Sequence, residues 1–294
     1  MRRLDTALLL SRVGLYKARA ALGPHAPPPA RTSSMAPARG TLLYQGAERN
    51  LGMAVTVSVV VPVKDEAGNI APLAREIAAA LASEPAGEIV FVDDGSSDST
   101  PATLKALKSE IPALRVIQHA RNLGQSRAIR TGVRASLGEI VVTLDGDGQN
   151  DPADIPMLLK ILREADPAEK VGMVTGVRAI RRDNASRRWA SSLANRFRRR
   201  MLNDQATDSG CGLKAFRREA FLALPYFDHM HRFMTALMLR ERYQVRFVDV
   251  NHRPRGTGAS KYNNLQRVIV GLIDTFGVRW LQSRFRGTTE AKEL

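Results

Sequence analysis

Cysteine, acidic residues and long uncharged apolar segments are all scarce in this chain. Its 294 residues contain one cysteine, Cys211, so a disulfide framework is excluded and a reducing compartment is expected. No run of about eighteen apolar residues without charges occurs, so no membrane-spanning helix is expected. The length suits one large α/β domain or two small ones.

The shortage of acidic residues leaves the chain strongly basic. Lys and Arg number 44 against 29 Asp and Glu, which gives a formal net charge of +15. A charge of this size indicates an anionic partner: a nucleic acid, a phosphorylated substrate or an acidic membrane surface. Charge alone does not choose among the three.

Residues 1–52 differ in composition from the rest of the chain. A short stretch with several Arg and Lys residues precedes a segment rich in Pro, Ala and Ser at 24–37, which cannot build a core. The apolar part of this region, residues 7–10, is too short for the hydrophobic region of a signal peptide. We expect a disordered or weakly ordered tail. A basic amphipathic membrane helix, a transit-like segment and a natural start at Met53 remain as alternatives.

Strand and helix patterns alternate from Met53 onwards. Strands are predicted at residues 55–61, 88–92, 114–118 and 139–144, and helices at residues 69–81, 101–108 and 125–135. The first strand is rich in β-branched residues throughout, which is typical of a strand buried on both faces. The alternation predicts an α/β domain that starts at Met53, with a mostly parallel sheet and helices on both faces. Ligands of such sheets bind beyond the carboxyl ends of the strands.

Acidic residues follow three of the predicted strands. Lys64-Asp65-Glu66 follows the first strand, Asp93-Asp94 the second and Asp145-Gly146-Asp147 the fourth. Ordinary turn chemistry explains Asp93-Asp94 equally well. Asp145, Asp147 and Gln149 stand at alternate positions, so their oxygen-bearing side chains would share one face of an extended segment. A divalent cation accounts for this cluster, because it prefers oxygen ligands and bridges carboxylates to diphosphate oxygens.

Five motifs lie in order between Val55 and Tyr262. They read VSVVVPVKDEAGNI, IVFVDDGSSDST, NLGQSRAIRTGVRASLGEIVVTLDGDGQNDP, TDSGCGLKAFRRE and RPRGTGASKY. Together they resemble the family 2 glycosyltransferases of the GT-A fold, which implies a GT-A domain over residues 53–262. The similarity is greatest to the group of dolichol-phosphate mannose synthase and the bacterial polyprenyl-phosphate glycosyltransferases. The last motif is similar to that group's Arg-x-x-Gly-x-Ser-Lys element.

This resemblance implies roles for individual residues. It implies binding of the nucleotide-sugar donor by Pro62, Lys64, Glu66, Asp94, Asp145, Gly146, Asp147, Arg232, Arg255 and Lys261. It implies binding of an acceptor phosphate by Arg178, Arg187 and Ser191, and of Mg²⁺ or Mn²⁺ by Asp147 and Gln149. Lys64 departs from the aromatic residue often found at its position, so the nucleotide base stays open.

Two regions rich in arginine indicate which anionic partner the chain binds. Residues 178–200 contain nine arginines and one acid, Asp183, which favours an anionic leaflet and a lipid phosphate over nucleic acid because no nucleic-acid motif is present. Residues 263–294 hold an apolar pattern of helical spacing, from Leu265 to Phe285, flanked by arginines. It predicts an amphipathic helix that packs on the core or lies in the membrane interface. Relatives in the resembled group often carry transmembrane helices here, so this chain is expected to be peripheral or held by a membrane-anchored partner.

The expected function is inverting transfer of a sugar from a UDP- or GDP-linked donor to a polyprenyl phosphate, at the cytoplasmic membrane face. A lipid phosphate is already anionic, so it needs no general base, whereas a hydroxyl acceptor does. Asp145 and Asp147, with the metal, would then stabilise the leaving diphosphate. Asp208 is a base if the acceptor is a hydroxyl, or otherwise a turn residue that positions the acceptor loop. A basic nucleic-acid- or membrane-binding protein with a vestigial sugar site is the alternative from another class.

Overall fold

The computed structural model describes residues 54–84, 86–178, 196–206, 208–254 and 264–287; for residues 264–269 it describes the backbone alone. All of them belong to one compact unit, Glu48–Leu294. The predicted tail at residues 1–52 lies outside the described residues.

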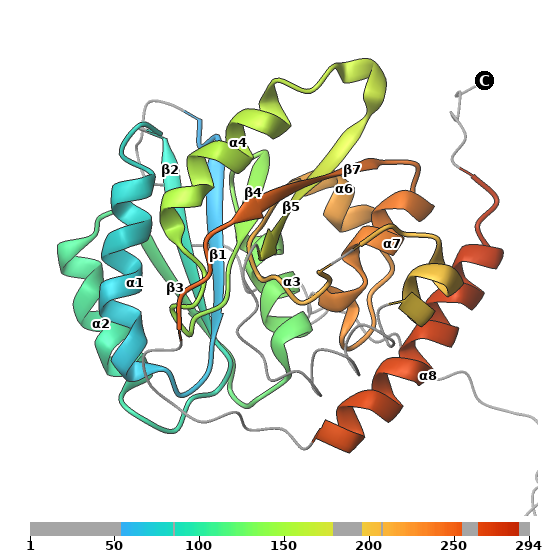
Figure 1. Ribbon diagram of the computed structural model, residues 1–294. Helices are drawn as coiled ribbons and strands as arrows, with labels where there is room; N and C mark the ends of the chain where they lie inside the picture. Colours follow the sequence, from blue (N-terminus) through green and yellow to red (C-terminus); the bar gives the residue numbers. More distant parts are fainter. Residues whose placement is uncertain (1–53, 85, 179–195, 207, 255–263, 288–294) are drawn as a thin grey trace, which may run out of the picture. The chain divides into compact units, whose positions relative to one another are not determined.

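One seven-stranded sheet forms the centre of this unit (Figure 1). Its strands are β1 (Val57–Val63), β2 (Gly87–Asp93), β3 (Leu114–Gln118), β4 (Ile140–Thr143), β5 (Val171–Arg178), β6 (Lys214–Arg217) and β7 (Gln244–Val250). They lie in the order β3-β2-β1-β4-β6-β5-β7. All neighbours pair in parallel except β6, which is antiparallel to both β4 and β5. The expected α/β class with a mostly parallel sheet is confirmed.

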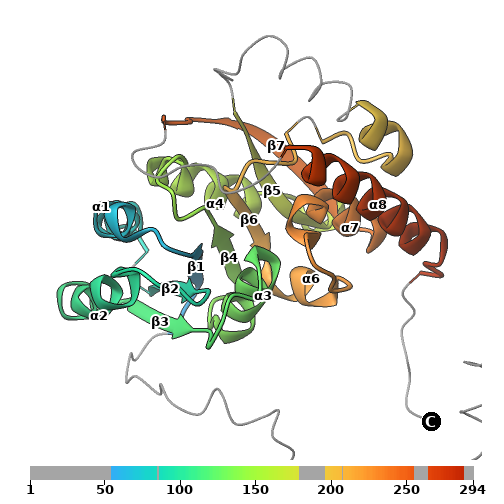
Figure 2. The same ribbon diagram turned by 90° about the horizontal axis from the view of Figure 1, so that it is seen from below.

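Helices cover both faces of the sheet, as Figure 2 shows. One face carries α1 (Ala67–Ala80), α2 (Thr100–Glu110) and α4 (Ile155–Arg163), and the other carries α3 (Gln125–Ala135), α6 (Arg218–Ala223), α7 (Met234–Arg240) and α8 (Asn264–Ser283). Short 3₁₀ turns are formed by η1 (Pro152–Asp154), η2 (Pro167–Glu169) and η3 (Met230–Arg232). Two hydrophobic clusters, one on each face, contain the buried side chains of these helices. The sheet is therefore buried on both sides, which explains why β1 is apolar along most of its length.

The C-terminal helix α8 lies beside α7 on the second face of the sheet. Val278 is fully buried there, Arg240 Nε donates to the Leu281 carbonyl at 3.1 Å, and Gln282 Nε2 donates to the Leu202 carbonyl at 3.0 Å. Among the described helices, none is both long enough and apolar enough to cross a bilayer. The contacts hold α8 on the folded unit, with part of its surface left exposed.

Candidate active site

The loops after β1 and β2 are joined by a dense set of hydrogen bonds. Lys64 Nζ donates to the Gly95 carbonyl at 3.1 Å, and Asp65 Oδ1 accepts from the Ser97 amide at 2.7 Å. The Glu66 amide donates to Thr100 Oγ1 at 3.0 Å. Three residues that follow β1 thus fix the turn after β2. Lys64 and Glu66, both predicted to bind the donor, lie in this pair of loops.

Asp94 anchors the segment that leads into α3. Its Oδ1 accepts from the Leu123 amide at 2.9 Å and lies 2.8 Å from His119 Nδ1, while its Oδ2 accepts from the Gly124 amide at 2.8 Å. Gly124 has a φ of +88°, a conformation that favours glycine. The structure therefore gives Asp94 a positioning role at the start of α3, and its predicted contact with the donor stays a prediction.

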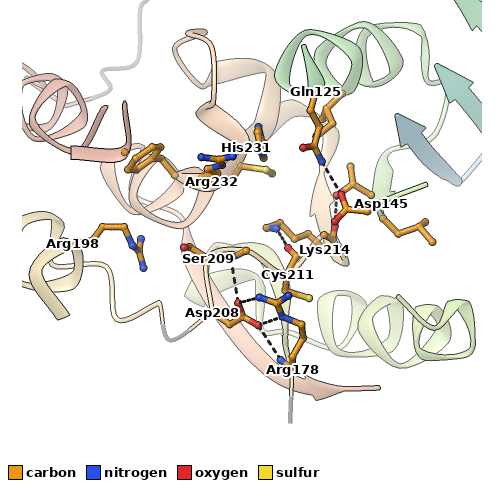
Figure 3. Close-up of a pocket in the computed structure, with 18 of the residues that line it drawn as sticks. Gln125, Asp145, Arg178, Arg198, Asp208, Ser209, Cys211, Lys214, His231 and Arg232 are labelled. Atoms are coloured by element: carbon orange, nitrogen blue, oxygen red, sulfur yellow. Dashed lines mark hydrogen bonds and ion pairs between the residues drawn. The ribbon is translucent and has the colours of Figure 1, made fainter. Parts of the chain in front are cut away.

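A cavity of about 490 Å³ opens beside the carboxyl end of β4 (Figure 3). Five of the predicted site residues line it: Pro62, Asp145, Arg178, Asp208 and Arg232. The predicted residues Lys64, Glu66, Asp94, Gly146, Asp147 and Gln149 are not part of its lining. Arg187, Ser191, Arg255 and Lys261 lie outside the described residues. The cavity thus joins part of the predicted donor site to part of the predicted acceptor site.

Asp145 stands at the cavity wall just after β4. Gln125 Nε2 donates to its Oδ1 at 2.7 Å (Figure 3). Loss of water around the carboxylate and, next, the negative charge of Asp147 raise the pKa of Asp145 to about 6. A Cβ atom on Gly212 would lie 2.5 Å from this carboxylate, so only glycine leaves it room. Positive charge brought by a ligand or an ion would favour the ionised form of Asp145.

Asp147 and Gln149 lie close together on the turn that follows. The Gln149 amide donates to Asp147 Oδ1 at 3.2 Å, and Gln149 Nε2 donates to the Arg253 carbonyl at 3.5 Å. The second bond is donated by the side-chain nitrogen of Gln149. The side-chain oxygen of Gln149 is the atom that would bind a cation. Within the described ranges no three His, Cys, Asp or Glu side chains form a metal cluster. Two hard oxygen donors fit Mg²⁺ or Mn²⁺, which commonly take their other ligands from phosphates and water.

Arg178 and Asp208 form a bidentate ion pair at the opposite wall of the cavity. Arg178 Nε donates to Asp208 Oδ2 at 2.6 Å, and Nη2 donates to Oδ1 at 2.7 Å (Figure 3). The hydrogen bonds to Asp208 raise the pKa of Arg178 above its ordinary value. A Cβ atom on Gly210 would lie 3.1 Å from Nη2, so this glycine also gives the pair room. Sequence reasoning named both residues but missed that they bind each other.

Three further residues of the cavity were missed altogether. Gln125 binds Asp145, His231 Nδ1 lies 2.7 Å from Ser126 Oγ, and Lys214 is 6% exposed. Loss of water, and then the charge of Arg232, lower the pKa of His231 well below its ordinary value, so the imidazole is neutral near pH 7. Gln125 and Lys214 lie within motifs quoted above, and that position was the signal that could have found them.

Comparison with known proteins identifies the family. The sequence model of glycosyl transferase family 2 matches residues 58–224, and the chain belongs to this family. It is 34% identical over 224 residues to a dodecaprenyl-phosphate galacturonate synthase of Rhizobium johnstonii, covering 74% of this chain and 65% of that protein. It is 37% identical over 215 residues to an undecaprenyl-phosphate 4-deoxy-4-formamido-L-arabinose transferase of Pseudomonas aeruginosa, covering 71% and 61%. The chain therefore spans slightly less than two thirds of the length of these relatives.

A solved structure shows the same fold. Glucosyl-3-phosphoglycerate synthase from Mycobacterium tuberculosis, in complex with Mn²⁺, UDP-glucose and phosphoglyceric acid, matches with a TM-score of 0.58. It is 20% identical, and the match covers 76% of this chain and 80% of that one. At this identity the likeness establishes the GT-A fold and nothing about the ligands of this chain.

Proposed function

We propose that this chain transfers a sugar from a nucleotide diphosphate donor to a polyprenyl phosphate. The observation that carries the proposal is the cavity, which has Asp145 of the donor side on one wall and Arg178 on the other. Its lining also includes Leu272 of α8, whose side chain is 42% exposed, so an apolar surface adjoins the polar walls. The names of the two relatives, both polyprenyl-phosphate sugar transferases, support the same substrate classes.

The reaction requires one displacement at the anomeric carbon. An oxygen of the acceptor phosphate forms the new bond to this carbon while the bond to the donor diphosphate breaks, which inverts the configuration. The acceptor oxygen is already anionic, so no proton has to be removed. A divalent cation bound by Asp147 and Gln149 would supply positive charge to the departing diphosphate. Gln125 fixes the orientation of Asp145 on the donor side of the cavity.

The remaining predicted groups extend this site. We assign Pro62, Glu66, Asp94, Arg255 and Lys261 to the donor, with Arg232 among them at the cavity wall. Arg178, Arg187 and Ser191 are assigned to the acceptor phosphate, which guanidinium groups bind well through paired donors. Asp208 is already bound by Arg178 on both oxygens, which favours a positioning role over that of a base. The phosphate acceptor is thereby favoured over a hydroxyl acceptor.

A direct assay tests the proposal. Purified protein is incubated with Mg²⁺ or Mn²⁺, labelled UDP- or GDP-sugars, and either undecaprenyl phosphate or undecaprenol. We expect label to enter the organic phase with the phosphate and not with the alcohol. Equal transfer to the alcohol would contradict the phosphate acceptor, and absence of transfer from every donor would contradict the proposed function.

Replacing Gly212 by alanine is expected to lower this transfer by about a hundredfold or more. The new Cβ would lie 2.5 Å from Asp145 Cγ, so the carboxylate has to move, and a shift of about 1 Å at a reacting centre can cost that much. Gly277→Ala on α8 is the matched control, since nothing lies within 4 Å of its Cβ position. Transfer rates and melting temperatures of both variants check the prediction. A folded Gly212→Ala protein with full activity would show that the position of Asp145 is unimportant.

We further propose that α8 lies against the cytoplasmic face of the membrane. Three large side chains on it are more than half exposed: Ile273 at 64%, Phe276 at 57% and Trp280 at 58%. Phe276 also contacts Phe197, a residue of the cavity wall, with ring centroids 6.3 Å apart. Phe276 therefore lies next to the cavity, where the lipid chain of the acceptor would leave it. Exposed Arg279 and Arg284 suit an anionic leaflet.

The double change Phe276→Asp and Trp280→Asp is expected to abolish most binding to lipid vesicles. Both side chains are exposed, so the fold should survive while a surface suited to the interface becomes charged. Co-sedimentation with vesicles containing phosphatidylglycerol measures the effect. Replacing two exposed residues of α2, Lys105 and Lys108, by Asp serves as the control. Unchanged vesicle binding by the α8 variant would rule out this helix as the membrane contact.

A further inference from the structure

Lys214 is a nearly buried lysine at the centre of the cavity. It begins β6, where it pairs with Thr143 of β4 and Thr175 of β5, and it is 6% exposed. Its ammonium donates to the Cys211 carbonyl. Figure 3 shows its side chain between Asp145 and the Arg178–Asp208 pair. The charge of Lys214 thus lies between the two walls that we assign to donor and acceptor.

The other buried or partly buried cations of this cavity have partners that Lys214 lacks. Arg178 is held by Asp208, and Arg198 by Asp204. Lys214 forms an ion pair with no carboxylate in the described part of the chain, and its hydrogen bond to Cys211 uses one of three ammonium donors. Asp145 lies close enough to Lys214 for their charges to interact, but no ion pair joins the two. A buried charge without a partner is costly, so its retention in a cavity points to an anionic ligand.

The position of Lys214 indicates whether it binds the donor diphosphate, the acceptor phosphate or the transferred sugar. The cation that would meet the donor diphosphate is assigned to Asp147 and Gln149, which do not line the cavity, while Asp145 and Arg232 of the donor side do. The acceptor phosphate is assigned to the wall that contains Arg178. The transferred sugar lies between these groups, and its binding would remove water from the Lys214 ammonium. A neutral sugar would leave that charge buried without an ion-pair partner, whereas an acidic sugar would supply one.

We propose that the donor sugar is a uronic acid, whose carboxylate pairs with the ammonium of Lys214. This inference rests on the proposed function and adds the chemical class of the sugar. A carboxylate carries one negative charge and accepts hydrogen bonds from the two ammonium donors that Cys211 leaves unused. Lys214 would then distinguish a uronate from the corresponding neutral hexose.

Binding of matched donor pairs tests the assignment. Each pair differs only at C6: UDP-glucuronate with UDP-glucose, UDP-galacturonate with UDP-galactose, and GDP-mannuronate with GDP-mannose. Dissociation constants are measured by calorimetry with Mn²⁺ present, without acceptor. For the base and sugar that bind best, we expect the uronate to bind about ten- to a hundredfold more tightly than its neutral partner. Equal or tighter binding of the neutral sugar would overturn the inference and leave the proposed function intact.

A substitution of Lys214 tests whether this residue causes the preference for the uronate donor. Lys214→Met keeps most of the length of the side chain and removes its charge, and we expect the ratio of the two dissociation constants to fall close to one. Lys214→Gln replaces it if the methionine variant does not fold, and Lys105→Met on α2 is the control for a lost surface charge.

Three results count against the assignment. A preference for the uronate that survives in the variant would overturn it. Weaker binding of undecaprenyl phosphate with an unchanged ratio would overturn it too, because Lys214 would then serve the acceptor phosphate. If neither nucleotide sugars nor free UDP and GDP bind the wild-type protein, the proposed function itself fails.

Discussion

Asp147→Ala is expected to lower sugar transfer by about a thousandfold or more while the protein remains folded. Asp147 and Gln149 are the two side chains that we assign to the divalent cation, and their contact at 3.2 Å places them on one turn. Without the carboxylate the cation loses its charged protein ligand, and the leaving diphosphate loses the positive charge that stabilises it. Removing one such stabilising group from an active site typically costs about a hundred- to a thousandfold, and the loss of a whole cation costs more.

The matched control for this variant is Asp166→Asn. Asp166 is an exposed aspartate that caps the short η2 turn, accepting from the Ala168 amide at 2.8 Å, and it does not line the cavity. We expect this control to transfer sugar at the wild-type rate. Excess EDTA should stop the wild-type protein, and added Mn²⁺ should restore it. Full turnover in EDTA would contradict the metal-dependent mechanism.

The parallel half of the sheet was predictable because its signals are local. The predicted strand at 114–118 coincides with β3 and the predicted helix at 125–135 with α3. The other predicted boundaries in this half differ from β1, β2, β4, α1 and α2 by one or two residues. In each element the spacing of apolar residues reports directly on which faces are buried. The antiparallel strand β6 was not predicted, because it begins and ends with charged residues, Lys214 and Arg217, instead of forming an apolar run.

The cavity was only partly predictable because its contacts join distant parts of the chain. The motifs correctly placed Asp145 after a strand, yet nothing in the sequence indicated that Gln125 would bind it. Arg178 and Asp208 stand thirty residues apart and meet because β5 and the turn before β6 lie together in the sheet. The burial of Lys214 likewise follows from its pairing between β4 and β5. Pairings of this kind depend on strand order, which residue spacing does not encode.

Helix α8 occupies the region where a C-terminal helix was expected at residues 265–285. The sequence left open whether its apolar residues pack on the core or face the membrane. In the part whose side chains are described, Val278 is buried while Ile273 and Trp280 are exposed. One helix therefore supplies both a packing surface and an exposed apolar surface. Apolar spacing alone could not separate the two, because it does not reveal how much of the helix its neighbours cover.

Arg178→Ala is expected to weaken binding of polyprenyl phosphate by about a hundredfold or more. Losing a charge-assisted contact to the acceptor accounts for about ten- to a hundredfold. The ion pair adds a second effect, since the variant removes the Arg178 guanidinium from the buried Asp208 carboxylate, which then faces an anionic acceptor. Arg178→Lys should restore only part of the affinity, because an ammonium cannot reproduce the paired contact.

The double variant Arg178→Ala with Asp208→Asn separates these two effects. It removes both charges of the pair, so we expect it to bind the acceptor more tightly, and to melt at a higher temperature, than Arg178→Ala alone. Asp208→Asn by itself should lower transfer by about tenfold or less, because a positioning residue is lost but no proton transfer depends on it. A general base in this position would instead contribute about a hundred- to ten-thousandfold. Titrations of donor and acceptor on each variant, together with transfer rates, distinguish the two roles. If Asp208→Asn abolishes transfer with normal binding of both substrates, Asp208 acts as a base and the acceptor is a hydroxyl.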